Sequence, residues 1–328
     1  MLDISVVVIT NNQIGTIERT LESIFSQKTN FSYEVLVADD ASIDGTREVL
    51  KKWKRRYSDR MQLYLRKKNV GPTRNAYYPL LHAEGKYIAS LEGDDYWSDN
   101  HFLQRQVEFL ESHSEYIGIQ DRCLVVDEQD QAIPDKNGLT GTEFWKFDKS
   151  VYTLEDYAMW RMPGHLSAMV YRNIYPEVEN RCKVYVQMDK FVGDKTILML
   201  LIVRGDIYCT DKISMHYRLV ESADGNNWMS KSRKRNIRFR EYRMINRIEV
   251  YIQKYYNPIF SMELLKCSKI AAVAIVWMKR PNRENTEVLH RILWYEGCPA
   301  KRIRIAYRAI LVKLGWSLIG QPEHRVGG

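Results

Sequence analysis

Three carboxylates follow a short apolar segment of the chain. Residues 87–91 predict a buried strand, and Glu92, Asp94 and Asp95 come directly after it. Clustered carboxylates that lose water repel one another unless a cation neutralises them. Mg²⁺ and Mn²⁺ accept such oxygen ligands together with diphosphate oxygens. We therefore predict that Asp94 and Asp95 bind Mn²⁺ or Mg²⁺, with a solvated acidic turn as the alternative.

Two other positions carry groups suited to a nucleotide. Asp39 ends the predicted strand 33–39, where its carboxylate can accept an N–H from the edge of a uracil or a similar base. The run from Ser42 to Gly45 fits turn and capping chemistry instead. Arg74 falls in the first turn of a predicted helix, and a helix N-terminus together with an arginine suits an anionic ligand.

The elements that position these residues alternate between strand and helix. Apolar runs predict strands at 4–10, 33–39, 62–65, 87–91, 116–126 and 166–171, and apolar residues at helical spacing predict helices near 14–25, 49–57, 73–83, 99–113 and 194–203. This alternation implies an α/β fold with a mostly parallel sheet and flanking helices. In such sheets ligands bind beyond the carboxyl ends of the strands, which is where Thr10, Asp39 and Glu92 fall.

Five segments of the chain, in this order and spacing, resemble the family 2 glycosyltransferases of the GT-A fold. The segments are Val6–Asn12, Leu21–Gln27, Val37–Thr46, Asn69–Asn75 and Gly85–Trp97. The resemblance covers about residues 1–110, with weaker matches to about residue 222. It implies an inverting enzyme that moves a sugar from a nucleotide diphosphate donor, with UDP favoured, to an acceptor hydroxyl.

The resemblance also implies roles for matching residues. Asp94 and Asp95 correspond to the family's metal motif. Family members commonly have Asp where this chain has Glu92, whose longer side chain makes a direct metal contact less expected, so Glu92 is assigned to the diphosphate or acceptor side. The residues implied to contact the nucleotide are Thr10, Asp39, Arg74 and Asp94.

An inverting enzyme needs a general base that removes the proton of the acceptor hydroxyl. The resemblance places this base at the start of a late helix, where Asp194 stands. Asp189 is close enough in sequence to compete, and capping the helix is the plainer role for Asp194. His165, His216 and Arg218 are further candidates for diphosphate or acceptor contacts.

Three other functions compete with the glycosyltransferase prediction. A dinucleotide-dependent oxidoreductase needs a GxGxxG turn after a strand, and the first strand is not followed by one. A sugar nucleotidyltransferase is expected to carry a Gly-rich loop with a basic residue near the N-terminus, and residues 9–13 lack it. A degenerate glycosyltransferase domain that acts as a non-catalytic binding module stays as the alternative, although the retained acidic motif argues against it.

The composition favours a folded protein of the reducing cytoplasm. Hydrophobic residues make up 45% and charged residues 27% of the chain. The five cysteines form no CxxC pair, which disfavours a zinc site or a disulfide framework. The N-terminus lacks the features of a secretory signal, and the longest later apolar run, 270–278, is far shorter than the roughly 20 residues that cross a bilayer.

Basic residues are in excess only toward the C-terminus. Residues 1–228 hold 28 Lys and Arg against 34 Asp and Glu, whereas residues 229–328 hold 21 against 7. We predict a GT-A catalytic domain over residues 1–225 and a basic helical region over residues 226–328.

The basic region has two interpretations. The amphipathic run Lys301–Leu318 suits peripheral binding to an anionic membrane at the inner face of the plasma membrane, or packing as a core helix or as a helix of a homodimer. Many relatives act on lipid-linked glycans, so the expected acceptor is a glycan or a polyprenol-linked sugar. Nucleic acid is not an expected partner, because a basic tail alone is weak evidence for such binding.

Overall fold

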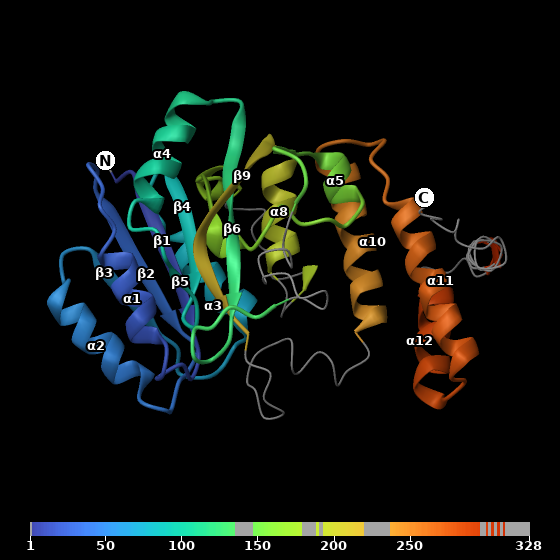
Figure 1. Cartoon of the computed structure of the whole chain (residues 1–328). Coiled ribbons are helices and arrows are strands. Elements are labelled where there is room, and N and C mark those ends of the chain that lie inside the picture. Colours follow the sequence, from blue (N-terminus) through green and yellow to red (C-terminus); the bar gives the residue numbers. More distant parts are fainter. Residues whose placement is uncertain are drawn as a thin grey trace, which may run out of the picture. The chain divides into compact units, whose positions relative to one another are not determined.

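The computed structural model describes residues 2–134, 147–178, 188–189, 193–219 and 237–295, together with residues 300, 303, 304, 307, 308 and 311. The chain divides into two compact units, one of residues 1–157 with 161–220 and one of residues 158–160 with 221–328. The predicted boundary after residue 225 and most of the predicted helix Lys301–Leu318 lie outside the described residues. The first unit contains a sheet with helices, and the described part of the second is helical (Figure 1).

One sheet runs through the first unit. Its strands are β1 Ile4–Thr10, β2 Tyr33–Asp39, β3 Met61–Leu65, β4 Tyr87–Glu92, β5 Tyr96–Trp97, β6 Tyr116–Val126, β7 Val151–Tyr152, β8 Met169–Arg172 and β9 Asp206–Arg218. The order along the sheet is β3-β2-β1-β4-β8-β6-β9-β5, and β7 pairs with β9. Neighbours among β3, β2, β1 and β4 are parallel, whereas β8 is antiparallel to both β4 and β6. The parallel arrangement therefore holds for the first four strands, and the sheet as a whole is mixed.

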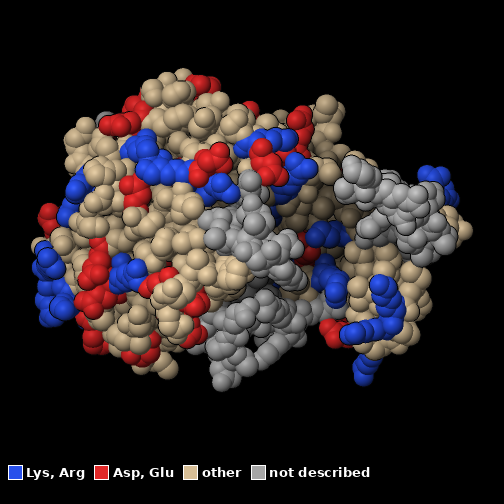
Figure 2. Space-filling view, viewed as in Figure 1, with Lys and Arg blue, Asp and Glu red and all other residues tan. Residues whose placement is uncertain are grey.

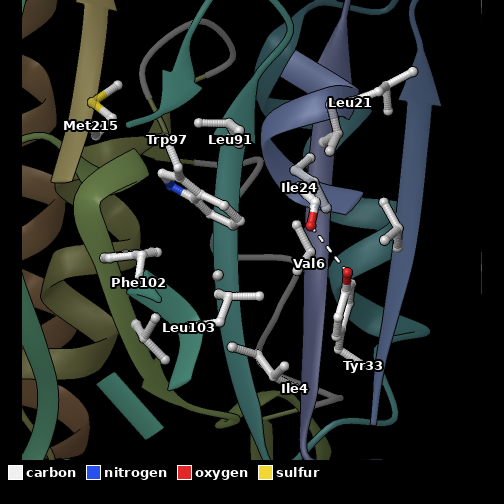
Figure 3. Close-up of a cluster of buried hydrophobic side chains, with 14 of the residues drawn as sticks. Ile4, Val6, Leu21, Ile24, Tyr33, Leu91, Trp97, Phe102, Leu103 and Met215 are labelled. Carbon is white, nitrogen blue, oxygen red and sulfur yellow. Dashed lines mark hydrogen bonds between the residues drawn. The ribbon is translucent and has the colours of Figure 1, made fainter. Parts of the chain in front are cut away.

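Helices cover both faces of this sheet. In the first unit they are α1 Ile17–Phe25, α2 Thr46–Arg56, α3 Pro72–Leu81, α4 Phe102–Ser112, α5 Leu154–Ala158, α6 Tyr175–Val178 and α8 Asp194–Ile202. Ile4, Val6 and Val8 alternate along β1 and share a buried cluster with residues of α1, α2 and α4. Figure 3 shows this cluster, in which the hydroxyl of Tyr33 donates to the carbonyl of Ile24 at 3.0 Å. Helix α3 lies against β1 and β2.

Two predicted elements begin later than the sequence pattern suggests. Helix α1 starts at Ile17, and Ile14 precedes it with 46% of its side chain exposed. The predicted strand 166–171 opens with a 3₁₀ turn, Leu166–Ala168, and β8 starts at Met169. The His165 ring accepts a hydrogen bond from the Ser167 N–H, which stabilises the turn over an extended conformation.

In the second unit, three helices whose full length is described pack around a core of their own. They are α10 Arg238–Tyr255, α11 Glu263–Lys279 and α12 Arg283–Trp294. Tyr242 from α10 lies in one cluster with residues of α11 and α12, among them Ile270 and Ile292. Ion pairs of 2.6 Å between Lys266 and Glu249 and 2.7 Å between Lys269 and Glu241 also join α10 to α11. Over the part of the chain that is described, no helix has both the length and the apolar character needed to span a membrane.

Candidate active site

A tight turn after β4 brings the three predicted carboxylates together. Glu92, Asp94 and Asp95 each offer one oxygen, and these oxygens lie within 4.8 Å of one another. The turn packs directly against the end of β1: a Cβ atom on Gly93 would lie 2.4 Å from the Gln13 amide oxygen. It would also lie 2.8 Å from the Thr10 hydroxyl. The Thr10 side chain therefore leaves little room for a side chain at position 93, and Thr10 borders the acidic turn as expected.

Five buried oxygens around the carboxyl ends of β1, β2 and β4 have no hydrogen-bond partner within the described structure. A buried polar atom without a partner costs about 1–3 kcal/mol, so such a group of atoms indicates a ligand that supplies the missing contacts. Four of the atoms belong to residues predicted to bind nucleotide or metal, and Thr73 is an addition. They are Thr10 Oγ1, Asp39 Oδ1, Thr73 Oγ1, Asp94 Oδ1 and Asp95 Oδ2.

The carboxylates of the turn are held in an environment that disfavours negative charge. Burial, together with the charges of Asp94 and Asp194, raises the pKa of Glu92 to about 8. Burial likewise raises the pKa of Asp94, and it raises the pKa of Asp95 well above its usual value, with Asp94 and Glu92 adding to the effect. A divalent cation would relieve this repulsion, and hard carboxylate oxygens are the ligands that Mg²⁺ and Mn²⁺ prefer. The residues present therefore fit such an ion, and Glu92 joins the two aspartates as a candidate ligand.

Asp194 is the first residue of α8, and its charge acts on the acidic turn. Besides raising the pKa of Glu92, it contributes to the raised pKa of Tyr217. The Asp194 side chain keeps contact with solvent, but the protein atoms packed around it raise its own pKa, and the charge of Lys195 opposes this. The competing residue, Asp189, is buried in a short described stretch before α8. The structure thus couples Asp194 electrostatically to the predicted metal ligands.

Tyr217 was not singled out from the sequence as a site residue. Its ring lies 4.8 Å from the His165 ring, measured between centroids. Burial raises the pKa of Tyr217, and the charges of Glu92, Asp95, Asp94 and Asp194 raise it further. The phenol therefore keeps its proton beside the carboxylates and can act as a hydrogen-bond donor. Burial lowers the pKa of His165 to about 4, so this imidazole is neutral at physiological pH.

His216 and Arg218 flank the acidic turn from the end of β9. The Nδ1 atom of His216 lies 2.6 Å from the Tyr96 hydroxyl, and the Arg19 guanidinium stacks 3.8 Å above the centre of the Tyr96 ring. Burial lowers the pKa of His216, with Arg19 and Arg218 adding to the effect. Two of the predicted contact residues therefore adjoin the cluster, His216 through Tyr96 and Arg218 through Asp94 and Asp95.

The contacts of Arg218 are internal to the protein. Its backbone N–H donates to Asp95 Oδ1 at 3.0 Å, and its Nε donates to the Asp94 carbonyl at 3.2 Å. The guanidinium also donates to the carbonyls of Asp127 and Glu128 and pairs with Asp130 at 2.7 Å. These contacts make Arg218 a support of the acidic turn, and its predicted contact with a diphosphate stays a prediction.

Asp39 lies at the end of β2 and is fully buried. Its Oδ2 atom accepts from Arg47 Nε at 2.6 Å and from the Ser42 N–H at 3.2 Å. The next residue, Asp40, is structural, because its carboxylate accepts from the backbone N–H groups of residues 70 and 71 at 2.7 and 2.8 Å. Arg74 is exposed in the first turn of α3. Arg47 is the second residue of α2, two positions before the predicted helix 49–57, and carried no signal in the sequence.

Comparisons with known proteins agree with this arrangement. The family model described as glycosyl transferase family 2 matches residues 5–167. An uncharacterized protein of Mycobacterium tuberculosis strain H37Rv is 40% identical over 111 residues, which cover 34% of this chain and 32% of that protein. EpsE of Bacillus subtilis strain 168, whose name assigns it provisionally to the glycosyltransferases, is 38% identical over 125 residues, which cover 38% of this chain and 44% of EpsE. The matched segment thus spans less than half the length of these relatives.

Two solved structures share the fold at low sequence identity. The first comprises residues 1–349 of TarS from S. aureus in complex with UDP-GlcNAc, with a TM-score of 0.65 and 17% identity, covering 94% of this chain and 83% of that one. The second is the mannosyltransferase PcManGT from Pyrobaculum calidifontis in complex with GDP-Man and Mn²⁺, with a TM-score of 0.51 and 18% identity, covering 96% of this chain and 87% of that one. The likeness extends over nearly the whole chain.

Proposed function

Because the chain carries a family 2 glycosyltransferase domain with the GT-A fold, we propose that it is an inverting glycosyltransferase. It transfers a sugar from a nucleotide diphosphate donor, with UDP as the nucleotide, to a hydroxyl of a glycan or lipid-linked acceptor. The observation that supports this most strongly is the acidic turn, in which Glu92, Asp94 and Asp95 gather within 4.8 Å under the charge of Asp194.

The donor binds at the carboxyl ends of the parallel strands. Asp39 accepts an N–H of the base, Thr10 and Arg74 contact the sugar–phosphate part, and Asp94 and Asp95 would hold Mn²⁺ or Mg²⁺, with Glu92 as a third ligand. When bound, the ion neutralises the negative charge of the diphosphate. Thr10, Asp39, Asp94 and Asp95 each have a buried side-chain oxygen with no hydrogen-bond partner among the described residues. These oxygens support the placement, since each one gains a contact from the sugar donor or its ion.

Asp194 is the general base. Its carboxylate takes the proton of the acceptor hydroxyl, the acceptor oxygen forms a bond to the anomeric carbon, and the bond from that carbon to the diphosphate oxygen breaks on the opposite face. A raised pKa makes the carboxylate a stronger base, which suits this role near neutral pH. His165 and Tyr217, whose ring centroids lie 4.8 Å apart, line the acceptor position.

The second unit brings the enzyme to an anionic membrane surface, where a lipid-linked acceptor would be found. Lys279, Arg280 and Arg283 are exposed around the turn between α11 and α12, next to Met278, whose side chain is 45% exposed. Figure 2 shows basic side chains gathered at the end of these two helices. Basic residues beside an exposed apolar group favour anionic lipid headgroups.

Cosedimentation with vesicles tests the membrane part of the proposal. We expect binding to vesicles that contain phosphatidylglycerol, weaker binding to pure phosphatidylcholine, and a loss in the triple variant Lys279→Ser, Arg280→Ser, Arg283→Ser. The matched control, Lys51→Ser with Lys52→Ser, removes exposed charges from α2 and should bind as wild type does. Equal binding to both vesicle types would contradict a charged contact, and a molar mass of two chains in light scattering would favour the homodimer interpretation.

A donor panel tests the catalytic part. Purified protein is mixed with UDP-, GDP-, CDP- and dTDP-sugars with and without Mn²⁺ or Mg²⁺, and nucleotide release is measured beside donor binding. We expect release that requires the ion and is lost in Asp95→Asn, with Asp211→Asn, an aspartate whose side chain is 93% exposed, as the control. If no donor binds under any condition, the non-catalytic binding module becomes the better description.

A further inference from the structure

The Asp39 carboxylate has one oxygen that is already used by the protein. Arg47 Nε donates to Oδ2 at 2.6 Å, and the Ser42 N–H donates to the same atom at 3.2 Å. The other oxygen, Oδ1, is buried and has no hydrogen-bond partner among the described residues. A second donor group of Arg47 binds the Arg66 carbonyl at the end of β3, so the guanidinium is fixed from two sides. Asp39 therefore presents a single acceptor atom to whatever binds beside it.

A single acceptor discriminates between the edges of nucleotide bases. Uracil has one N–H on its pairing edge, flanked by two carbonyl oxygens. Guanine has two adjacent donors on that edge, N1–H and the exocyclic amine, which match both oxygens of one carboxylate. Because Oδ2 already accepts from Arg47, guanine would leave one of its N–H groups without a hydrogen bond in a buried site, and this costs about 1–3 kcal/mol.

The protein also offers a hydrogen-bond donor for one of the uracil carbonyl oxygens. Thr73 is 2% exposed, and its hydroxyl has no partner within the described structure. It lies in the first turn of α3, which is fastened to β2 on either side of it: the Gly71 N–H donates to Asp40 at 2.8 Å, and the Asn75 amide donates to the Ala38 carbonyl at 2.7 Å. Thr73 thus stands beside the end of β2, and its hydroxyl can act as the donor that complements the acceptor of Asp39.

We infer that Arg47 is a specificity-determining residue, which restricts the donor site to a base edge with one N–H, as in uracil, by occupying one oxygen of Asp39. Arg47 acts through Asp39 and does not touch the base, so it is a positioning residue. Thr73 binds the carbonyl beside that N–H. The inference rests on the proposed function, since it requires that the base lies at Asp39.

Binding of free nucleotides by isothermal titration calorimetry tests this. For the wild-type protein with Mg²⁺ we expect UDP to bind at least about tenfold more tightly than GDP or CDP, and N3-methyl-UDP to lose binding by a similar factor. Arg47→Met should reduce the UDP-to-GDP preference about tenfold, because Oδ2 of Asp39 then accepts only from the Ser42 N–H and can take a hydrogen bond from the base as well. A merely structural role for Arg47 would weaken both nucleotides equally and leave their ratio unchanged.

Thr73 gives a second test that does not disturb the buried ion pair. Thr73→Val should weaken UDP about tenfold without lowering the melting temperature, and Thr73→Ser should bind UDP as wild type does. If the wild-type protein binds UDP and GDP equally well, or Thr73→Val binds UDP normally, the inference is overturned while the glycosyltransferase proposal stands. If it binds no nucleotide at all, the proposed function itself fails.

Discussion

The backbone N–H of Arg218 donates a hydrogen bond of 3.0 Å to Asp95 Oδ1. This contact joins the end of β9 to the turn after β4, residues that are 123 positions apart in the sequence. Because the guanidinium of the same residue also binds the Asp94 carbonyl and the segment at 127–130, one arginine fixes both the acidic turn and the loop beside it. The geometry of the candidate metal site thus depends on a residue that supplies no ligand.

Replacing Arg218 by methionine should destabilise the first unit. The change removes the charged donor from three partly buried carbonyl oxygens and one of the two arginines that pair with Asp130, which we expect to lower the free energy of unfolding by about 3 kcal/mol. Urea denaturation followed by tryptophan fluorescence measures this. Lys52→Met is the control, since its ion pair with Glu18 is exposed and should contribute less than about 1 kcal/mol. Equal stabilities of the two variants would show that the Arg218 contacts carry little energy.

Gly93→Ala should impair the acidic turn directly. The added methyl group would lie 2.4 Å from the Gln13 amide oxygen and 2.8 Å from the Thr10 hydroxyl, so the turn must shift away from β1. We expect a loss of about 1–3 kcal/mol in stability and at least a tenfold weaker affinity for Mn²⁺ in calorimetric titration. Gly15→Ala is a matched control, because nothing lies within 4 Å of its added methyl group. Unchanged Mn²⁺ affinity in Gly93→Ala would argue against this turn as the metal site.

The stability of the metal-free protein should fall as pH rises from about 5 to 8. The pKa of Glu92 is raised from 4.5 to about 8 in the folded protein, so between these values the folded state holds a proton that the unfolded chain has lost. The free energy of unfolding then decreases by up to about 1.4 kcal/mol per pH unit for this group and levels off above pH 8. Melting temperatures across this range measure the slope, which Glu92→Gln should reduce.

Mn²⁺ should oppose this loss. The ion binds the deprotonated carboxylates, so the rise in melting temperature that it causes should grow between pH 6 and 8. The same titration with Ca²⁺ and with no divalent ion separates a specific effect from ionic strength. A shift that is independent of pH would show that the ion binds elsewhere.

Asp194→Asn should abolish turnover while preserving donor binding. The amide cannot accept the proton of the acceptor hydroxyl, and loss of a general base typically lowers kcat by about 10²–10⁴. Nucleotide release and donor affinity are measured in parallel, with Asp211→Asn as the surface control and Asp189→Asn as the competitor. A large loss of kcat in Asp189→Asn, with normal turnover in Asp194→Asn, would reassign the base.

The sequence by itself determined the elements and the identity of the acidic motif. Almost continuous apolar runs in residues 4–10 and 33–39 specify buried parallel strands, because a strand covered on both faces needs apolar side chains on both. Asp39 ends the strand 33–39, and Asp94 and Asp95 follow the strand 87–92. Their positions near one another were predictable, since residues that end parallel strands meet at one edge of the sheet. Local patterns carry this information because the apolar residues of each strand or helix recur at a short, fixed spacing.

Contacts between distant segments were decided only by the tertiary structure. The pairing of Arg47 with Asp39 depends on how far the arginine side chain reaches across a turn. The burial of Thr73 depends on how α3 lies against β2. Tyr217 feels the charges of the carboxylate cluster because β9 runs beside β6. No repeat in the sequence encodes these distances. They arise when the sheet forms and brings residues that are far apart in the chain into one desolvated site. In such a site a single hydrogen bond or charge determines which atoms remain available to a ligand.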